Sequence, residues 1–576
     1  MTSPLMHELA GALVDNESLA RFAQRDGIRV FPQSLTRTPS ASYVVVDVDQ
    51  QSRLLQIGGV PQIGEPLWRD PTSRQYLYAF SPSDDANLRA FVERIDHSFL
   101  PRPQRAQAAI AAGNRHPEIS LPAVFDAFDT ILRETGKNLA STVQLSATRE
   151  MTTDAEIAQR DGSNPTAPGH TRVSIRHLYH AGLWAAIRSG YRSGYTAEAD
   201  HFIVSGSDEA AIARSVEWVK EAILHAAGYT KFTTDTSRVF DLRADERHPR
   251  PWTESEIDDL FAARLTKEER AWVLDAFSAP FECEERAYRF SEPEIKRLAV
   301  KFGPSLKLNE ELYDSISRAK HGALFDFEPS LDEAETLTTT EELIFYMHWL
   351  RERGRPAQLV PPNLGFKKRQ AYPDSRAALA GYASHKMWPE LLGRVDRDFA
   401  GDPIAELKDR VAELAGVARF FDGTLSIHSG SGKQPEVLRS IGAATRGRLN
   451  YKISGELQLR LFDVLSEQPA GSEERALFER MAAACEQFAA AGAFGEESSL
   501  AAQYRASHGT YLGDADRGRA DGNLFLVFWL GNMVGSRDED GRFFKESLDR
   551  LPERIVAETR RRNAGYILWL ARHLFD

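Results

Sequence analysis

The stretch PIAELKDRVAELAGVARFFDGTLSIHSG, residues 403–430, decides the fold class. Its first part, residues 403–421, spaces apolar side chains as one face of a helix does, and LSIHSG reads as a short strand. Further strand-like runs alternate with helical patterns from about residue 135 onward. Such alternation is typical of a parallel sheet, either open or closed into a barrel.

Several of these strand-like runs end in side chains that carry charge or can bind a metal. Asp235 ends YTKFTTD, and Asp332 with Glu333 ends GALFDFEPSLDE. His428 ends LSIHSG, and Lys452 lies in RLNYKISG. In parallel α/β folds the active site lies at the carboxyl ends of the strands. The sequence therefore predicts that these side chains lie at one rim of the sheet.

The first 135 residues follow a different pattern. ASYVVVDVD, SRLLQIGGV and QYLYAFSP are strand-like runs separated by turn residues. Residues 101–117 are rich in Pro, Arg, Gln and Ala and read as a linker or a surface helix, and residues 121–136 read as an amphipathic helix. We therefore expect residues 1–135 to form an N-terminal β-rich region.

The composition excludes several classes of protein. The chain has 576 residues and a net charge of -12 with scattered basic residues, which argues against nucleic acid as a partner. Cys283 and Cys485 belong to no CxxC pair, so neither a disulfide framework nor a cysteine-based zinc site is expected. The N-terminus lacks the apolar core of a signal peptide, and no run approaches the length of a membrane span. A cytoplasmic protein is expected.

Seven segments, which come in the order of a known family, carry a resemblance to it. FEPSLDEAETLTTTEE, LSIHSGSGK and GRLNYKISG resemble the motifs S-V-D-E-T-x-T-P-T-T, S-I-H-S-G-S-D-K and G-R-F-H-V-K-T-A-G of the tagaturonate/fructuronate epimerase family, which includes tagatose 4-epimerases. GYTAEADHF, FTTD, EIKRLAVKFG and GSRDEDGRFF resemble four further stretches of that family. The similarity extends from about residue 190 to about residue 550.

The chain also departs from the family motifs. Gly432 stands where the family has Asp, and Asn450 stands where it has His. LVPPNLGFKKR, residues 359–369, lacks the Arg of the family's L-A-P-R-F. The chain is therefore identified as a divergent member whose substrate can differ from that of the family.

The resemblance implies a TIM-barrel-like parallel β/α core over residues 136–576, forming the catalytic domain. It also implies an isomerase of hexuronate catabolism that inverts C4 of a keto-uronate or ketohexose. C4 is β to the ketone, so its proton is not acidic. Transient oxidation would need a nicotinamide, but neither GxGxxG nor GxxxxGK[ST] occurs. Retro-aldol cleavage passes through an enediolate, which a divalent metal stabilises, and we favour this route.

The motif matches assign candidate roles to residues. Asp200, Glu333 and His428 are the expected ligands of a divalent ion such as Zn, Mn, Ni or Co, because carboxylates and imidazole suit these metals. His201 and Asp235 are the expected bases that deprotonate a hydroxyl. The structural alternative for Asp200 and His201 is a helix cap with a satisfied histidine, and for Glu333 an ordinary acidic turn.

Four further residues are candidates for binding the substrate. Lys433, Arg448 and Lys452 offer cations to a carboxylate or to hydroxyls. Thr336 offers a hydroxyl but is equally suited to capping the helix that follows. A solvated surface position is the alternative for Arg448. The expected partner is a small sugar acid or ketose, with no nucleic acid or membrane, and homo-oligomerisation stays open.

Two other functions fit the same residues. A metal-dependent sugar-acid aldolase or keto-enol isomerase would use the same ligands but release fragments or move the carbonyl group. A sugar-binding relative without catalysis is the alternative from another class, and Gly432 and Asn450 are its best support. Metal content and EDTA-sensitive turnover separate an enzyme from a binding protein.

Overall fold

A computed structural model describes residues 28–48, 51–82, 85–113, 115–146, 153, 155, 171, 173–332, 336–366, 372, 402–430, 432–453, 455–490 and 530–576. Glu333, one of the three expected metal ligands, therefore lies outside the described residues.

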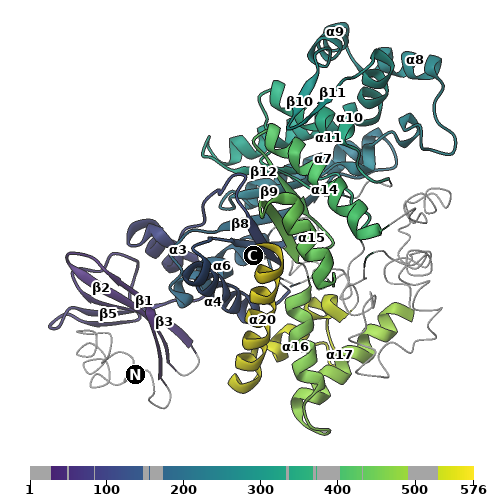
Figure 1. The fold of residues 1–576 in the computed structure, drawn as a ribbon. Helices are drawn as coiled ribbons and strands as arrows, with labels where there is room; N and C mark the ends of the chain where they lie inside the picture. Colours follow the sequence, from purple (N-terminus) through teal and green to yellow (C-terminus); the bar gives the residue numbers. More distant parts are fainter. Residues whose placement is uncertain are drawn as a thin grey trace.

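Eight parallel strands form the central sheet of the molecule (Figure 1). In chain order they are β6 (Ala109–Gly113), β7 (Ala140–Ser146), β8 (Thr196–Ile203), β9 (Lys231–Asp235), β12 (Asp326–Pro329), β13 (Leu359–Val360), β14 (Thr424–Ile427) and β15 (Leu449–Ile453). Their order in the sheet is β12-β9-β8-β7-β6-β15-β14-β13. Neighbours in space are therefore neighbours along the chain, except that β15 lies beside β6.

The two ends of this sheet meet. The backbone N–H of Gln358 donates to Phe327 O at 3.0 Å, and that of Leu331 donates to Pro361 O at 3.0 Å. These bonds bring the β13 side of the sheet to β12, so the sheet nearly closes into a barrel. The TIM-barrel-like parallel β/α core expected from the sequence is confirmed.

Helices surround the barrel and connect its strands (Figure 1). They are α4 (Pro117–Thr135), α6 (Ile175–Ser189), α7 (Glu209–His225), α8 (Glu254–Arg264), α9 (Lys267–Ala276), α10 (Glu292–Ala319), α11 (Thr340–Glu352), α14 (Pro403–Phe420), α15 (Pro435–Thr445), α16 (Glu456–Ser466), α17 (Glu473–Ala490), α19 (Phe544–Asp549) and α20 (Glu553–Leu574). A small hairpin of β10 (Phe281–Cys283) and β11 (Arg286–Tyr288) lies near α8 and α9.

The strands of the barrel alternate between apolar and polar faces. In β9 the side chains of Lys231 and Thr233 contact groups from other strands inside the barrel, whereas Phe232 faces outward and stacks on Phe202 of β8 at 6.1 Å. Alternation follows from the two-residue period of a strand. Barrels of this type are usually filled by branched apolar side chains. The charged side chains inside this barrel are therefore unusual and indicate a functional site.

An antiparallel sheet precedes the barrel, which confirms the expected N-terminal β-rich extension (Figure 1). Its strands are β1 (Ile28–Arg37), β2 (Ala41–Val48), β3 (Gln51–Gly58), β4 (Trp68–Asp70) and β5 (Gln75–Ala79), in the order β1-β2-β3-β5-β4. Helix α3 (Asp85–Arg94) covers one face, where Tyr43 and Phe91 lie edge to face at 5.9 Å.

The N-terminal extension packs against the barrel domain at the end of α6. Gly190 ends this helix with φ of 68°, and a Cβ at this position would lie 2.4 Å from Gln33 O of β1. Two reasons therefore require glycine at position 190: the left-handed backbone conformation and the close approach of β1. Arg192 reinforces the contact by donating to Gln33 O at 3.0 Å.

The first barrel strand comes from within residues 1–135. Residues 101–117 contain β6, Ala109–Gly113, which pairs with β15 on one side and β7 on the other. Small side chains suit β6 because all five residues are buried. We therefore propose that the β-rich region ends before β6, and that the barrel domain includes β6 and α4.

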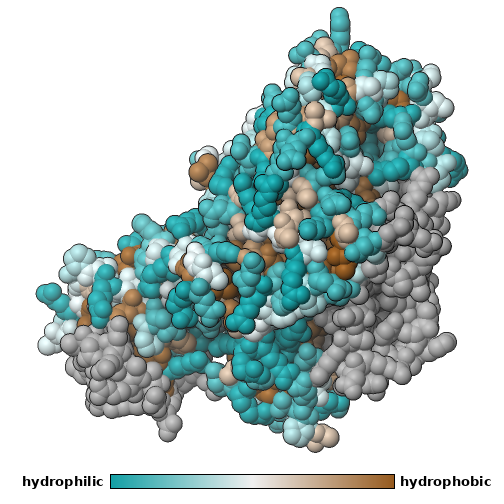
Figure 2. Space-filling model, in the orientation of Figure 1, coloured by the Kyte–Doolittle hydropathy of each residue, from teal (hydrophilic) through white to brown (hydrophobic). Residues whose placement is uncertain are grey.

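No helix within the described ranges is long and apolar enough to cross a membrane. Figure 2 shows a face on which hydrophilic residues predominate and apolar residues are scattered among them. Apolar surface residues that are scattered singly are normal in globular proteins.

Candidate active site

A β-bulge in β8 brings two neighbouring polar residues to the carboxyl rim of the barrel. The register between β8 and β9 shifts between Ala199 and Phe202, and His201 has φ of 52°. This conformation is uncommon for a residue other than glycine and is kept only where the surroundings enforce it. Because a bulge redirects a side chain, His201 lies beside Asp200, with Nε2 at 3.7 Å from Asp200 Oδ1.

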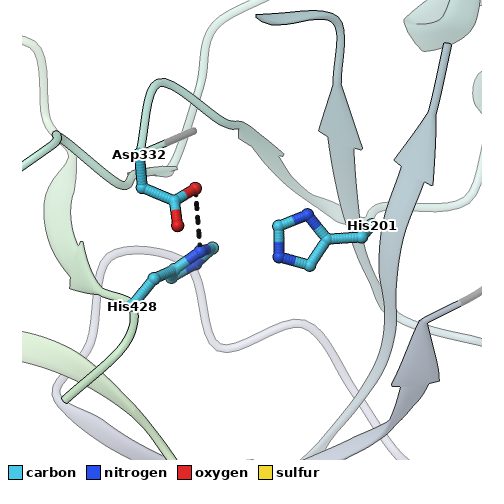
Figure 3. A group of neighbouring side chains, drawn as sticks. All are labelled: His201, Asp332 and His428. Carbon is cyan, nitrogen blue, oxygen red and sulfur yellow. Dashed lines mark ion pairs between the residues drawn. The ribbon is translucent and has the colours of Figure 1, made fainter. Parts of the chain in front are cut away.

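His201, Asp332 and His428 converge from three strand ends at this rim (Figure 3). Each side chain offers one possible ligand atom, and these atoms all lie within 4.8 Å of one another. Asp332 Oδ1 is 3.1 Å from His428 Nδ1, and the two imidazole centres are 5.3 Å apart. The arrangement brings two imidazoles and a carboxylate around one space, as a divalent metal ion requires.

Glu328 fixes the orientation of the His428 ring. Glu328 Oε1 lies 2.9 Å from His428 Nε2. Burial would raise the pKa of Glu328, but Lys231, Lys452 and His428 lower it well below its usual value. The ionised carboxylate accepts a hydrogen bond, so Nε2 carries the proton and donates. Nδ1 is left facing Asp332, and an outer carboxylate commonly orients a metal-binding histidine in this way.

Buried ion pairs among Glu198, Lys231, Glu328 and Lys452, here called the ion ladder, lie beneath the rim. Lys231 Nζ is 2.9 Å from both Glu198 Oε2 and Glu328 Oε2. Lys452 Nζ is 2.6 Å from Asp200 Oδ1, 2.7 Å from Glu328 Oε1, and in close contact with Glu198. The two lysines therefore connect the carboxylates of β8 and β12 across the barrel interior.

The cluster carries more negative than positive charge. Among the described residues its charged members are Glu198, Asp200, Asp235, Glu328, Asp332, Lys231 and Lys452. Five negative and two positive charges leave a net charge of −3 when both imidazoles are neutral. A cation at the rim would offset part of this excess.

The pKa values reflect the same charges. Burial would raise the pKa of Asp200, but His201 and Lys452 lower it to about 2. Burial would lower the pKa of His428, but Asp332 chiefly reverses this and raises it to about 9. Asp332 and His428 thus stabilise each other as an ion pair when no metal is bound.

Asp235 lies on the other side of the His201 ring. Its Oδ1 accepts hydrogen bonds from the Ser237 backbone N–H at 3.0 Å and from the Ser237 hydroxyl at 2.6 Å. Its Oδ2 is 3.8 Å from His201 Nδ1. The two expected bases, His201 and Asp235, are therefore adjacent at the rim.

The residues expected to bind substrate lie in different places. Lys433 is buried in the loop that follows β14, at the same rim as His428, with Nζ 5.1 Å from the centre of the Phe366 ring. Lys452 uses its ammonium group on carboxylates and on Thr233, whose hydroxyl is 3.2 Å away. An ammonium group has three N–H donors, so Lys452 is engaged within the protein.

Thr336 and Arg448 contact groups outside the rim cluster. The Thr336 hydroxyl accepts from Arg247 Nη2 at 2.9 Å and donates to Asp245 Oδ2 at 3.2 Å. Arg448 precedes β15 and donates to Ala106 O at 3.2 Å and to Thr424 Oγ1 at 3.3 Å. Because Arg448 precedes its strand, it lies at the amino rim of the barrel, opposite the cluster.

The structure adds functional candidates that the motifs did not identify. Glu198, Lys231 and Glu328 are not part of the predicted site, and Asp332 joins the two histidines among the described residues, to which Glu333 does not belong. The alternation of side chains along a strand could have identified Glu198. It lies two residues before Asp200, so both side chains face the same side of the strand. Asn450, at a departure from the family motif, donates to Ser426 Oγ at 2.7 Å inside the barrel.

The fold and the site define a class of protein: a β/α barrel whose ion-filled interior supports a carboxylate–imidazole cluster at the carboxyl rim. Residues 168–367 match the model of a family, UxaE, described as tagaturonate epimerase. The tagaturonate/fructuronate epimerase of Thermotoga maritima is 26% identical over 296 residues, which cover 50% of each chain. The resemblance to the tagaturonate/fructuronate epimerase family is thereby confirmed, although the chain matches only about half the length of this curated relative.

Solved structures extend the likeness in fold. The native crystal structure of fructuronate-tagaturonate epimerase UxaE from Cohnella laeviribosi has a TM-score of 0.67 and 19% sequence identity, covering 98% of this chain and 99% of that chain. A crystal structure of the same enzyme with glycerol has a TM-score of 0.65 at 19% identity, covering 97% of this chain and 99% of that chain. The common fold therefore includes the N-terminal extension as well as the barrel.

Proposed function

We propose that this chain is a divalent-metal-dependent epimerase that inverts C4 of a keto-uronate of the tagaturonate/fructuronate type. The observation that carries the proposal is the convergence of His201, Asp332 and His428 at the carboxyl rim of the barrel. The family match over residues 168–367 includes two of these three residues, and the matched relative is a tagaturonate/fructuronate epimerase.

The residues present fit a divalent cation. His428 Nδ1 is buried and faces Asp332 Oδ1 at 3.1 Å, so the imidazole proton that pairs with Asp332 is the one that a metal ion would replace. The net negative charge of the cluster favours a cation at the same place. We assign His201, Asp332 and His428 as the residues that hold Zn, Mn, Ni or Co. When bound, the ion supplies Lewis acidity to oxygen atoms on which negative charge develops.

Asp235 is suited to act as the base. Asp200 accepts a hydrogen bond from Lys452, and its lowered pKa makes it a poor proton acceptor at neutral pH. Asp235 instead faces His201 and is hydrogen-bonded to Ser237. In this proposal His201 holds the metal, and Asp235 takes the proton of the C4 hydroxyl.

The reaction then follows a retro-aldol course. Loss of the C4 hydroxyl proton forms an aldehyde at C4 as the C3–C4 bond breaks, and the electron pair passes to the ketone fragment as an enediolate. Rotation of the aldehyde about its bond to C5 presents the opposite face. Re-formation of the C3–C4 bond and return of the proton from Asp235 give the C4 epimer, with no external oxidant or reductant.

Lys433 is the candidate for binding the substrate carboxylate. Its ammonium group lies in the loop directly after His428, and its side chain is buried against Phe366. A partly desolvated cation binds a carboxylate strongly. This choice favours a uronate over a neutral ketohexose, so Lys433→Met should weaken turnover of keto-uronates through KM more than turnover of ketohexoses.

The test is to load the full chain with each metal and to follow C4 stereochemistry of tagaturonate, fructuronate and ketohexoses by NMR. Epimerisation that EDTA abolishes and metal restores is the expected result. His428→Ala should eliminate turnover, whereas Arg448→Gln, at the opposite rim, should retain it. Full activity of His428→Ala, or loss of activity in both variants alike, would contradict the site.

Two further measurements separate the mechanisms. Reduction by borohydride during turnover should trap a three-carbon alcohol from the aldehyde fragment. Substrate deuterated at C4 should keep its label through epimerisation, because the C4–H bond is not broken. Accumulation of free fragments would instead indicate an aldolase, and metal-independent sugar binding without turnover would indicate a binding protein.

A further inference from the structure

A second cavity lies where the N-terminal sheet meets the C-terminal helices. Its volume is about 670 Å³, and its walls come from β1 and β2, the start of α4, the end of α6, and α19 with α20. None of its lining residues belongs to the rim cluster described above. It is therefore separate from the candidate active site.

One end of the cavity holds two carboxylates, one imidazole and one ammonium group. His116, Glu118 and Asp549 place ligand atoms within 4.8 Å of one another. However, Lys545 Nζ lies 3.3 Å from Glu118 Oε1 and 3.0 Å from Asp549 Oδ1. The ammonium group already supplies a cation to both carboxylates, so this end does not require a metal ion.

The other end carries three arginines. Arg29 forms an ion pair with Glu553 at 2.8 Å, and Arg188 forms one with Asp47 at 3.5 Å. Arg560 of α20 lines the same cavity but has no carboxylate within ion-pair distance among the described residues. The two ion pairs occupy Arg29 and Arg188, so Arg560 has no ion-pair partner of its own among the described residues, although Glu553, Asp126 and Asp47 act on it from beyond ion-pair distance.

The hydrogen bonds of Arg560 are also incomplete. Its Nε is buried and has no hydrogen-bond partner among the described residues, and its Nη2 reaches only Glu118 O at 3.5 Å. Burial lowers the pKa of Arg560, Glu553 offsets only part of this effect, and Arg29 lowers the pKa further; burial also lowers the pKa of Arg188 to about 10. A guanidinium that is removed from water without a counter-ion destabilises the folded protein.

We propose that the arginine end of this cavity binds a small oxyanion, a phosphate or carboxylate group of a metabolite, with Arg560 as its principal contact. The planar guanidinium group pairs with both kinds of oxyanion through two parallel hydrogen bonds. The free Nε of Arg560 supplies one of them. The ligand would compensate the unpaired charge and join β1 to α20, which together hold the N-terminal sheet against the barrel.

Equilibrium dialysis of the full chain with radiolabelled inorganic phosphate, in chloride buffer at constant ionic strength, tests this proposal. The expected result is one saturable site per chain that Arg560→Met removes or weakens at least about tenfold, as loss of a charge-assisted hydrogen bond predicts. Arg560→Lys keeps the charge but loses the paired geometry, so its affinity should be intermediate. Displacement by unlabelled galacturonate or by glucose 6-phosphate identifies whether a carboxylate or a phosphate group binds better.

Arg561→Met is the matched control, because Arg561 is the next residue of α20 and pairs with Glu558 on the surface. It should leave phosphate binding unchanged. Arg560→Met should also raise the unfolding midpoint in chloride, since it removes an unpaired buried charge. Absence of saturable binding to the wild type, or equal loss in Arg560→Met and Arg561→Met, would overturn the proposal.

Discussion

His428 Nε2 lies 2.9 Å from Glu328 Oε1, so the ring is held from inside the barrel while its Nδ1 faces the rim. Glu328 is fully buried and also forms ion pairs with Lys231 and Lys452. We infer that it orients His428 rather than reacts. This relationship makes Glu328 a positioning residue for the proposed metal.

Glu328→Ala should lower the affinity for Mn or Zn by about 10–100-fold, because loss of an outer carboxylate frees the histidine ring. Isothermal titration calorimetry of the metal-free protein measures this change. Glu328→Gln keeps an acceptor oxygen for Nε2 and should recover part of the affinity. Unchanged metal affinity in Glu328→Ala would show that His428 is held by other contacts.

Lys452→Met should destabilise the fold by about 3–5 kcal/mol, because Asp200 and Glu328 would lose their buried counter-ion. Urea denaturation measures the shift in the unfolding midpoint. Lys296→Met is the control, since Lys296 pairs with exposed Asp258 and should change stability by less than about 1 kcal/mol. Equal effects of the two substitutions would contradict the importance of the interior ladder.

Asp245 should make stability sensitive to acid. Burial would raise its pKa, but Arg247 and Lys301 outweigh burial and hold the pKa below its ordinary value of 3.8. The unfolded chain therefore binds more protons near that value, so the stabilisation is complete above about pH 5 and is lost as the pH falls.

The measurement is the urea midpoint of wild type and Asp245→Asn between pH 7 and pH 3. Asp245→Asn should be less stable at pH 7, and the difference between the two proteins should shrink on acidification. Lys301 also contacts Glu342 at 2.6 Å, and Arg247 holds Thr336 and Leu337 O of the loop after β12. A difference that is constant with pH would show that Asp245 contributes through packing alone.

Two substitutions of Gly by Ala should have opposite effects. A Cβ at Gly430 would lie 2.4 Å from the Tyr451 ring, so Gly430→Ala must displace the loop between His428 and Lys433. We expect a loss of about 1–3 kcal/mol and reduced turnover. Gly565 in α20 has open space around it, and Gly565→Ala should stabilise the protein by about 0.5–1 kcal/mol. Thermal unfolding of both variants checks the signs, and a loss of stability in Gly565→Ala would refute the second.

Strand ends were the part of the site that the sequence could predict. Asp235 and His428 close apolar runs, and their position at one rim follows from the geometry of parallel strands. The bulge at Asp200 and His201 could not be predicted, because a left-handed histidine depends on tertiary contacts. Glu333 was predicted from a motif and lies outside the described residues, so it stays a prediction, whereas the position of Asp332 beside His428 follows from the chain after β12.

Two positions in the fold could not be predicted from the residues, for simple physical reasons. Residues 101–117 read as a linker because Pro and Arg surround a strand of alanines, and β6 is recognisable only from its place between β15 and β7. Arg448 precedes β15 whereas Lys452 lies near its carboxyl end, and a motif match does not show that such residues lie toward opposite rims. Glu198, Lys231 and Glu328 could not be recognised as partners of Lys452, because their ion pairs join strands that are distant in sequence.

The ladder of Glu198, Lys231, Glu328 and Lys452 also constrains how this barrel can diverge. Loss of one member leaves the opposite charge buried without an ion-pair partner. Simultaneous replacement of an acid and its basic partner by apolar side chains leaves no unpaired charge in the interior. Homologous barrels should therefore change these positions in pairs, and covariation between positions 231 and 198 or 328 would record that coupling.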